Sequence, residues 1–268
     1  MEFDIGKYFV EDGITYKEKG VTVYQFKDEL VEEFVKEFLL PFRQAYISDE
    51  DLDNGVENEV WTDKVEAISE QIPTLPNLQS GEFSEILLYF ISICFRCPEA
   101  NVIPLKWRWK ENQDTPCHLS DIVLMKCMDD ENPSEEDFMY VVESKGKAVA
   151  PSKNSKFSVM NDAIDGSSKD YVSRSGKMVA YMRKWYNREK NYNMARKVKR
   201  FGDSVEVDYQ KRYNAAIVVE RESLTTHVDN IKEEKLKEAE KNGISLIAVP
   251  IRNMKKVYER MYSEVINS

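Results

Sequence analysis

The sequence predicts a mixed α/β fold, a central sheet flanked by helices, with an N-terminal helical accessory region. Short apolar runs bounded by polar turns are typical of strands. They alternate with longer segments that have apolar residues every three or four positions, as helices do. Pro73 and Pro76 mark a break between two patterns. We therefore place a boundary near residue 78, with an accessory region over 1–78 and the core over 79–268.

The composition is that of a folded protein and excludes several classes. Of the 268 residues, 42% are hydrophobic and 32% are charged, which suits one large domain or a core with an accessory segment. A net charge of −10 excludes a surface that is basic all over but allows a local basic stripe. Four cysteines make no disulfide framework, residues 1–10 contain no apolar signal segment, and the longest apolar stretch, 86–95, is too short for a bilayer. We expect a soluble cytoplasmic protein without membrane contact.

In the accessory region we expect two helices and a loop. Residues 24–47 are predicted to be helical, and Pro41 is expected to kink or end that helix. The acidic stretch 49–58 is expected to be a loop, and 63–72 a second short helix. The first helix is supported by an apolar residue at every fourth position: Leu30, Phe34, Phe38 and Phe42.

The core is expected to begin with a helix followed by two strands. The helix starts at Ser80 or Gly81 and ends near Pro98. In 102–110, Leu105, Trp107 and Trp109 alternate with basic residues, which predicts a strand. Residues 118–125 are predicted to form the second strand.

The remaining core alternates helices and strands. An acidic loop at 129–137 leads into a third strand over 138–147, and a long polar helical region fills 157–200. Short strands at the start indicate a hairpin meander, and later helical crossovers indicate parallel pairing. The expected later elements are strands at 213–220 and 244–251 and helices at 229–241 and 253–266.

Acidic and basic residues at the ends of these elements suggest a catalytic site. Glu143 and Lys145 lie two apart on one strand, so their side chains share a face, and Asp121 belongs to the preceding strand. Glu82 and Glu85 lie on one face of a helix. Charges on a buried strand are costly unless they are paired or used. Carboxylates hold Mg²⁺ or Mn²⁺, and a nearby ammonium orients water, which together suit phosphodiester hydrolysis.

With these residues in this order, the chain resembles the PD-(D/E)XK nuclease superfamily. More narrowly, it resembles HamA, the nuclease-subunit family of the bacterial Hachiman antiphage system, over roughly 78–260. Two departures are Ser120, where the superfamily pattern has proline, and a longer stretch between Asp121 and Glu143. The segments that carry the resemblance are 80–88, 105–110, 118–122 and 142–145.

The resemblance implies a role for each residue. Asp121 and Glu143 would be metal ligands, the Ser144 carbonyl would complete the coordination, and Lys145 would position the attacking water. Glu85 is favoured over Glu82 as a further ligand, because apolar residues bury the helix directly behind it. Each residue also has a structural interpretation, as an ion pair at a strand end or as acids that favour a helix N-terminus.

The implied function is a Mg²⁺-dependent DNA endonuclease that hydrolyses without a covalent enzyme intermediate; Mn²⁺ is an alternative cofactor. The implied partner is the superfamily-two helicase HamB, which would restrain the nuclease until DNA is sensed. Residues 1–78 are the candidate docking surface. Two alternatives stay open: a catalytically inactive nuclease-like subunit that binds DNA or a partner, and a nuclease acting on RNA.

A basic stretch is the candidate nucleic-acid interface. Residues 174–200 contain ten basic residues and one acid, with tyrosines and a tryptophan between them. Basic residues bind phosphates and aromatic rings stack on bases. The alternative is a solvated helix face whose aromatic residues belong to the core. The predicted nucleic-acid-binding residues are Lys147, Lys153, Lys177, Arg183, Lys184, Arg188, Arg196 and Lys197.

The four cysteines and His118 are candidate zinc ligands by residue type. Cys94 and Cys97, with Cys117, His118 and Cys127, have metal-like spacing. The first two lie in an apolar helix, where free cysteine behaves as a small hydrophobe. We therefore predict no zinc site.

Overall fold

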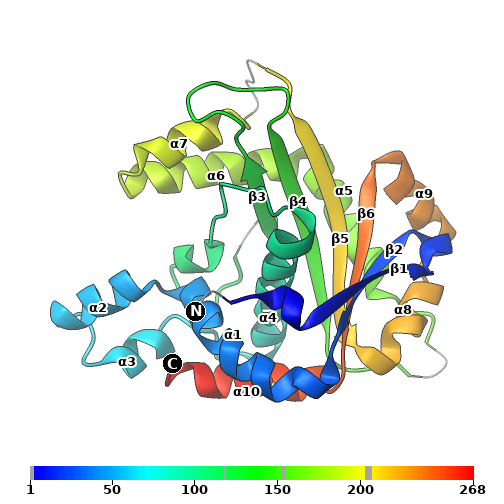
Figure 1. The fold of residues 1–268 in the computed structure, drawn as a ribbon, viewed down its shortest axis with the longest axis horizontal. Helices are drawn as coiled ribbons and strands as arrows, with labels where there is room; N and C mark the ends of the chain where they lie inside the picture. The colour runs from blue at the N-terminus through cyan, green and yellow to red at the C-terminus, as the bar shows by residue number, and fades with distance from the viewer. Residues whose placement is uncertain (1–2, 118, 153–154, 203–206) are drawn as a thin grey trace.

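A six-stranded mixed sheet forms the centre of the computed structural model, which describes residues 3–117, 119–152, 155–202 and 207–268 (Figure 1). The strand order is β1-β2-β6-β5-β4-β3. Strands β2, β6, β5 and β4 run parallel, and β1 and β3 are antiparallel at the two edges. The strands are β1 (Phe9–Tyr16), β2 (Val21–Phe26), β3 (Ile122–Lys126), β4 (Phe138–Lys147), β5 (Gln210–Glu220) and β6 (Ile244–Ile251). The predicted mixed sheet flanked by helices is confirmed.

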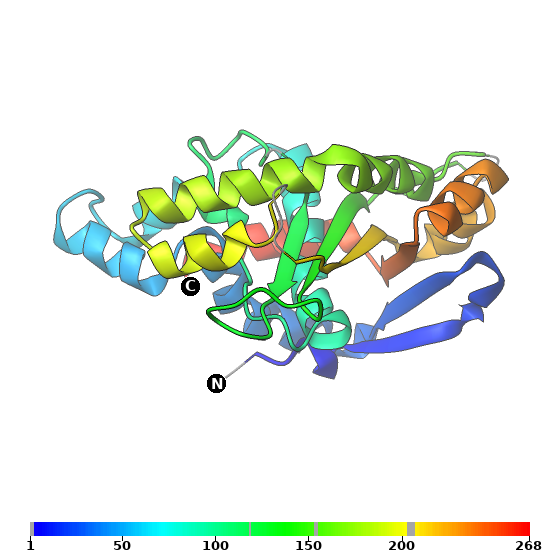
Figure 2. The ribbon, with the colours of Figure 1, turned by 90° about the horizontal axis from the view of Figure 1, so that it is seen from above.

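Helices cover both faces of the sheet, as the view from above shows (Figure 2). The first face carries α1 (Val31–Tyr46), α4 (Pro76–Ile91) and α10 (Met254–Val265). The second carries α5 (Val159–Lys169), α6 (Ser175–Arg188), α8 (Leu224–Asp229) and α9 (Glu233–Lys241), with α7 (Tyr192–Lys199) beside α6. Helices α2 (Asp49–Glu57) and α3 (Lys64–Ser69) lie at the end of α1.

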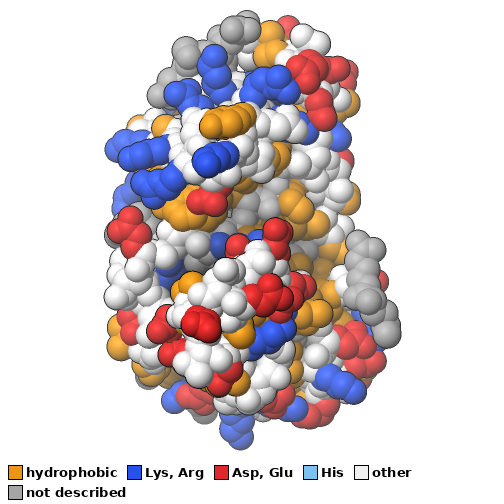
Figure 3. All heavy atoms as spheres, turned by 90° about the vertical axis from the view of Figure 1, so that its left-hand side faces the viewer, with side chains coloured by type: hydrophobic (Ala, Val, Ile, Leu, Met, Phe, Trp, Pro, Cys, Tyr) orange, Lys and Arg blue, Asp and Glu red, His pale blue; other side chains and the backbone are white. Residues whose placement is uncertain are grey.

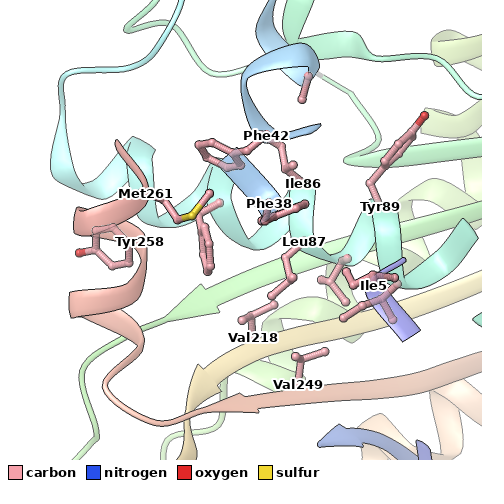
Figure 4. Packing of buried hydrophobic residues seen from close by; sticks show 14 of the residues in the cluster. Ile5, Phe38, Phe42, Ile86, Leu87, Tyr89, Val218, Val249, Tyr258 and Met261 are labelled. Atoms are coloured by element: carbon pink, nitrogen blue, oxygen red, sulfur yellow. The ribbon is translucent and has the colours of Figure 1, made fainter. Parts of the chain in front are cut away.

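The central strands are apolar on both faces, as expected for strands with helices on each side. In β5, Ala216 and Val218 contact the first helical layer, while Ala215 and Ile217 contact the second. Figure 4 shows the first layer, where Phe38 and Phe42 of α1, Ile86 and Leu87 of α4 and Met261 of α10 meet above Val218 and Val249. This packing fixes α4 against β4 and so positions its glutamates.

The predicted order of the core elements is confirmed in its main features. Strands β3 and β4 form an antiparallel hairpin, and β4, β5 and β6 are parallel with helical crossovers. The helical region 157–200 consists of α5, a π turn at Asp170–Arg174, α6 and α7. The strand at 138–147 matches β4.

Two expected elements are wrong, and a third begins later than expected. Residues 102–110 are not a strand: only Val102 forms a bridge, to Met125, and a 3₁₀ helix, η5 (Lys106–Trp109), follows. The alternation of basic and apolar residues does not reflect a strand here, because Lys106 is buried together with Trp107 and Trp109. The stretch 49–58 is helix α2 rather than a loop. The Ser48 side chain accepts the Asp51 N–H, and acids in the first turn favour the helix dipole. The helix expected over 24–47 begins only at Val31.

Several boundaries also shift. Pro41 lies inside α1 without ending it, and α4 begins at Pro76, a favoured first position, rather than at Ser80 or Gly81. The strand expected from 118 begins at Ile122, and His118 lies outside the described residues. The hairpin of β1 and β2 was not expected.

The N-terminal region is built into the sheet. Strand β2 pairs with β6, and α1 packs on α10, so residues 3–78 share one core with the rest of the described chain. The boundary near residue 78 stays a prediction. No helix in the described part is both long and apolar enough to cross a membrane.

Candidate active site

The β3–β4 hairpin brings Asp121 and Glu143 together. Ile122 pairs with Val142, so Asp121, one residue earlier, lies opposite Glu143. Both point to the α5 side, because the residues two positions away, Val123 and Val141, belong to the core on that side. The Asp121 Oδ2 atom accepts the Ser144 N–H at 2.7 Å. The two predicted acids therefore share one face of the sheet.

Glu143 is buried and held by two cations. Its carboxylate is 2.5 Å from Lys145 Nζ through Oε1, and Oε2 accepts a hydrogen bond from Arg174. Gly166 of α5 lies against this carboxylate, and a Cβ there would clash with it. Burial raises the pKa of Glu143, and the Asp121 charge raises it further, while Lys145 and Arg174 oppose the rise. Burial and the Asp121 charge therefore disfavour the ionised form of Glu143. Acids with shifted pKa values of this kind are typical of functional sites.

Glu85 approaches Asp121 through a buried lysine. Lys106 Nζ lies 3.0 Å from Glu85 Oε2 and 3.8 Å from Asp121 Oδ1. It also donates to the Ser120 carbonyl at 3.4 Å. Burial raises the pKa of Glu85 to about 7 against the attraction of Lys106. An ammonium group thus lies between the helix glutamate and the strand aspartate.

Glu82 has a different partner. It is 2% exposed and lies 2.7 Å from Lys110 Nζ, and burial raises its pKa. Of the two helix glutamates, Glu85 is the one that shares a cation with Asp121. Its role as a ligand stays a prediction.

The predicted coordination by Ser144 fits the strand geometry. The N–H and C=O of one strand residue point toward the same neighbouring strand, so its carbonyl lies on the side of Asp121. In the described residues, no cluster of three or more Asp, Glu, His or Cys side chains is placed to hold a metal ion. The acids are instead paired with lysine and arginine side chains.

Helix α6 carries the exposed basic residues. It starts directly after Arg174, beside Glu143, and its 14 residues extend about 20 Å away from it. Figure 3 shows Lys and Arg side chains gathered in the upper half, with acids below a hollow. Four basic side chains of α6 form no ion pair with any described residue: Lys177, Arg183, Lys184 and Arg188.

Helix α7 is partly neutralised by the acidic loop after β3. Arg196 lies 3.0 Å from Glu131, and the buried Lys197 lies 2.6 Å from Asp130. Both were predicted to bind nucleic acid. Lys147 is exposed at the end of β4, and Lys153 lies outside the described residues.

The aromatic residues of α6 are largely used in packing. Trp109 of η5 stacks on Trp185 with ring centroids 5.6 Å apart, and Tyr181 and Tyr186 complete the cluster. A cavity of about 440 Å³ lies beside Trp109, lined also by Lys106 and Tyr181. Within the basic stretch, base stacking is therefore open to Tyr181, which is 40% exposed, and to Tyr192 of α7, which is 65% exposed.

The cysteines are free thiols. Burial raises the pKa of Cys97 and of Cys117 to about 12, so both are protonated at neutral pH. A protonated buried thiol behaves as a small apolar side chain.

The sequence interpretation missed three residues that complete the site. Lys106 was counted only among the basic residues of an expected strand, Arg174 only within the basic stretch, and Asp170 was not considered. One signal was present: Ser120 stands where the nuclease pattern has proline, and its hydroxyl donates to Asp170.

The family model of HamA matches residues 6–265 and so includes every residue of this site. The chain belongs to the HamA family. Its membership associates it with Hachiman antiphage defence and points to a partner within that system. A comparison with curated proteins finds no match. The resemblance to HamA seen in the sequence is confirmed for this HamA-family chain.

Proposed function

We propose that this HamA-family protein is a metal-dependent DNA endonuclease, the effector of a Hachiman complex that a helicase partner restrains. One observation carries the proposal: Asp121 and Glu143 lie opposite each other on one face of the sheet, with Lys145 in contact with Glu143. This is the arrangement of two acids and an ammonium that phosphodiester hydrolysis needs.

The donor set suits Mg²⁺ or Mn²⁺. Hard divalent ions prefer carboxylate and carbonyl oxygens, which Asp121, Glu143 and the Ser144 backbone supply. Lys106 supports the fit, because its ammonium already lies between Glu85 and Asp121, a place that favours positive charge. Asp121, Glu143 and Ser144 would hold the ion, with Glu85 as a further ligand. When bound, a divalent cation would neutralise phosphate charge and lower the pKa of water.

The protein's own groups provide orientation and charge. Lys145 has a side chain that is 38% exposed, so it can reach a water molecule or a phosphate oxygen while it contacts Glu143. Arg174 keeps Glu143 in one orientation and adds positive charge beside it. Preorganised cations of this kind stabilise the negative charge that develops on the phosphate.

The exposed lysines and arginines of α6 would bind the DNA backbone. These residues follow Arg174 along α6. A duplex that lies along the helix would therefore reach Glu143 at the N-terminal end of α6. Phosphate contacts supply affinity without sequence preference. The overall charge of −10 makes DNA binding by the protein alone weak, which fits a need for a helicase partner.

Cleavage of a supercoiled plasmid tests the proposal. The protein, alone and with the helicase of its own system, is incubated with plasmid DNA and Mg²⁺, with EDTA as the metal-free control. We expect cleavage by the wild type and by the control Glu259→Gln, which removes an exposed acid of α10, but not by Glu143→Gln. Absence of cleavage under every condition would contradict the proposal.

The second candidate is a catalytically inactive subunit that binds DNA or a partner. It is favoured by the ion pairs themselves, because each of the three predicted carboxylate ligands already has a cation beside it. Infection assays separate the two: an inactive subunit would protect cells equally well with Glu143→Gln. A parallel RNA substrate tests for a nuclease that acts on RNA.

A further inference from the structure

The site contains a buried acid to which the proposed chemistry assigns no role. Asp170 is 0% exposed and begins the π turn between α5 and α6. A buried carboxylate is costly unless its oxygens are hydrogen-bonded or paired. Turns of this kind within helices occur frequently at functional sites.

Two residues satisfy the Asp170 carboxylate. Its Oδ1 accepts from Ser120 Oγ at 2.6 Å and from Arg174 Nε at 2.8 Å, and its Oδ2 accepts from the second guanidinium nitrogen at 3.1 Å. The Arg174 contacts are bidentate, which fixes the plane of the guanidinium group.

Each partner leads directly to a predicted metal ligand. Ser120 immediately precedes Asp121 in the chain, and Arg174 donates to Glu143 Oε2. One buried carboxylate is therefore linked to both strand acids, each through a single intermediate residue. The other predicted acid, Glu85, has no such link to Asp170 among the described contacts.

The π turn holds Asp170 in place independently of these contacts. The Asp170 carbonyl accepts from the Ser175 N–H and, at 2.8 Å, from the Ser175 hydroxyl. That hydroxyl lies 3.2 Å from the Tyr213 hydroxyl of β5. The backbone of Asp170 is thus attached to the sheet that carries Glu143.

We propose that Asp170 is a positioning residue that fixes the Asp121 and Glu143 carboxylates relative to each other through Ser120 and Arg174. The Asp170 carboxylate also neutralises part of the positive charge of Arg174. Without Asp170, the guanidinium would bind Glu143 alone and compete with a divalent cation for it. The effect on metal affinity rests on the proposed function, whereas the geometric coupling does not.

The first test compares Asp170→Asn with Asp165→Asn. Asp165 lies on α5 and pairs with Lys235, away from the two acids, so it controls for loss of an acid on that helix. We expect Asp170→Asn to weaken Mn²⁺ binding, followed by electron paramagnetic resonance, by about tenfold or more. The control should bind Mn²⁺ as the wild type does. Equal affinity in all three proteins would overturn the proposal.

A second readout needs no metal. The Ser144 N–H donates to Asp121, so its hydrogen exchange reports whether Asp121 is held in place. We expect exchange at Ser144 to be several-fold faster in Asp170→Asn and unchanged in Asp165→Asn. If wild type binds no Mn²⁺, this measurement alone decides the proposal.

A double-mutant cycle applies if Asp170→Asn does not fold. Ser120→Ala and Arg174→Lys each remove one link to Asp170, so their effects on Ser144 exchange should be non-additive if the links are coupled. Additive effects would overturn the proposal. The proposed function fails separately: a wild type that binds Mn²⁺ but cleaves no nucleic acid would leave the positioning role intact.

Discussion

The two sides of the sheet hold their charges differently. On the α5 side, the cations beside Glu143 reach solvent: the side chain of Lys145 is 38% exposed and that of Arg174 is 25% exposed. On the α4 side, Lys106 and Lys110, the partners of the helix glutamates, are 5% and 4% exposed. Under the proposed function, the open ion pairs of Glu143 can respond to a substrate, whereas the buried pair of Glu82 with Lys110 serves mainly to stabilise the fold.

The largest expected effect is a loss of stability when the buried ion pair of Glu82 with Lys110 is broken. Lys110→Met leaves Glu82 buried without its cation, which should lower the free energy of unfolding by about 3–5 kcal/mol. Denaturant unfolding measures it. The double variant Glu82→Met with Lys110→Met should recover most of the loss, because it leaves no unpaired charge. No recovery would mean that the pair is not buried as described.

The partly exposed pair of Lys145 with Glu143 should instead affect activity more than stability. Lys145→Met should reduce the rate of plasmid cleavage by about 10²–10³-fold, because it removes a cation from the developing charge. Its free energy of unfolding should change by no more than about 1 kcal/mol, since the side chain is partly solvated. A large loss of stability in this variant would remove the distinction between the two sides.

Glu85 should make stability depend on pH in the metal-free protein. Its folded-state pKa of about 7 lies above the ordinary value, so the folded form holds the proton more tightly. Its stabilising contribution is complete below pH 4.5 and is lost as pH rises through 7. Relative to Glu85→Gln, the wild type should therefore lose about 3 kcal/mol across that window. Parallel pH curves would contradict the burial of this acid.

The smallest effect concerns the two basic helices. Arg183→Ala on α6 should reduce the salt dependence of DNA binding by about one unit of slope, as expected for one lost phosphate contact. Arg196→Ala on α7 should change it less, because Glu131 already neutralises that residue. Binding titrations at several salt concentrations measure both. Equal slopes would indicate that the acidic loop moves away from α7 when DNA binds.

Much of this arrangement was predictable because it depends on local patterns. The apolar run of β4 and the position of Glu143 and Lys145 on it follow from a period of two residues, and the structure has the same strand bounds. The end of α9 at Lys241 follows from the glycine at residue 243, which adopts a positive φ, although the helix expected from 229 begins only at Glu233.

The remaining features depend on contacts between distant residues. A lysine at 106 in an alternating segment indicates a solvent-facing position, and only the carboxylate of Glu85, from another element, makes its burial favourable. The partnership of Ser120 with Asp170 likewise links two residues far apart in the sequence. No local pattern encodes such pairs, so only the fold shows them.

The pairing of β2 with β6 has a consequence for how the chain is made. Val21 lies beside Leu246, so β2 has no second strand to pair with until more than 220 further residues have been synthesised. Such distant pairing is slow to form. A nascent chain that stops before β6 leaves an open strand edge on β2 and another on β5, and is thereby exposed to aggregation and proteolysis. For the nuclease proposed above, removal of such unfinished copies would keep an incomplete enzyme from acting on the cell's own DNA.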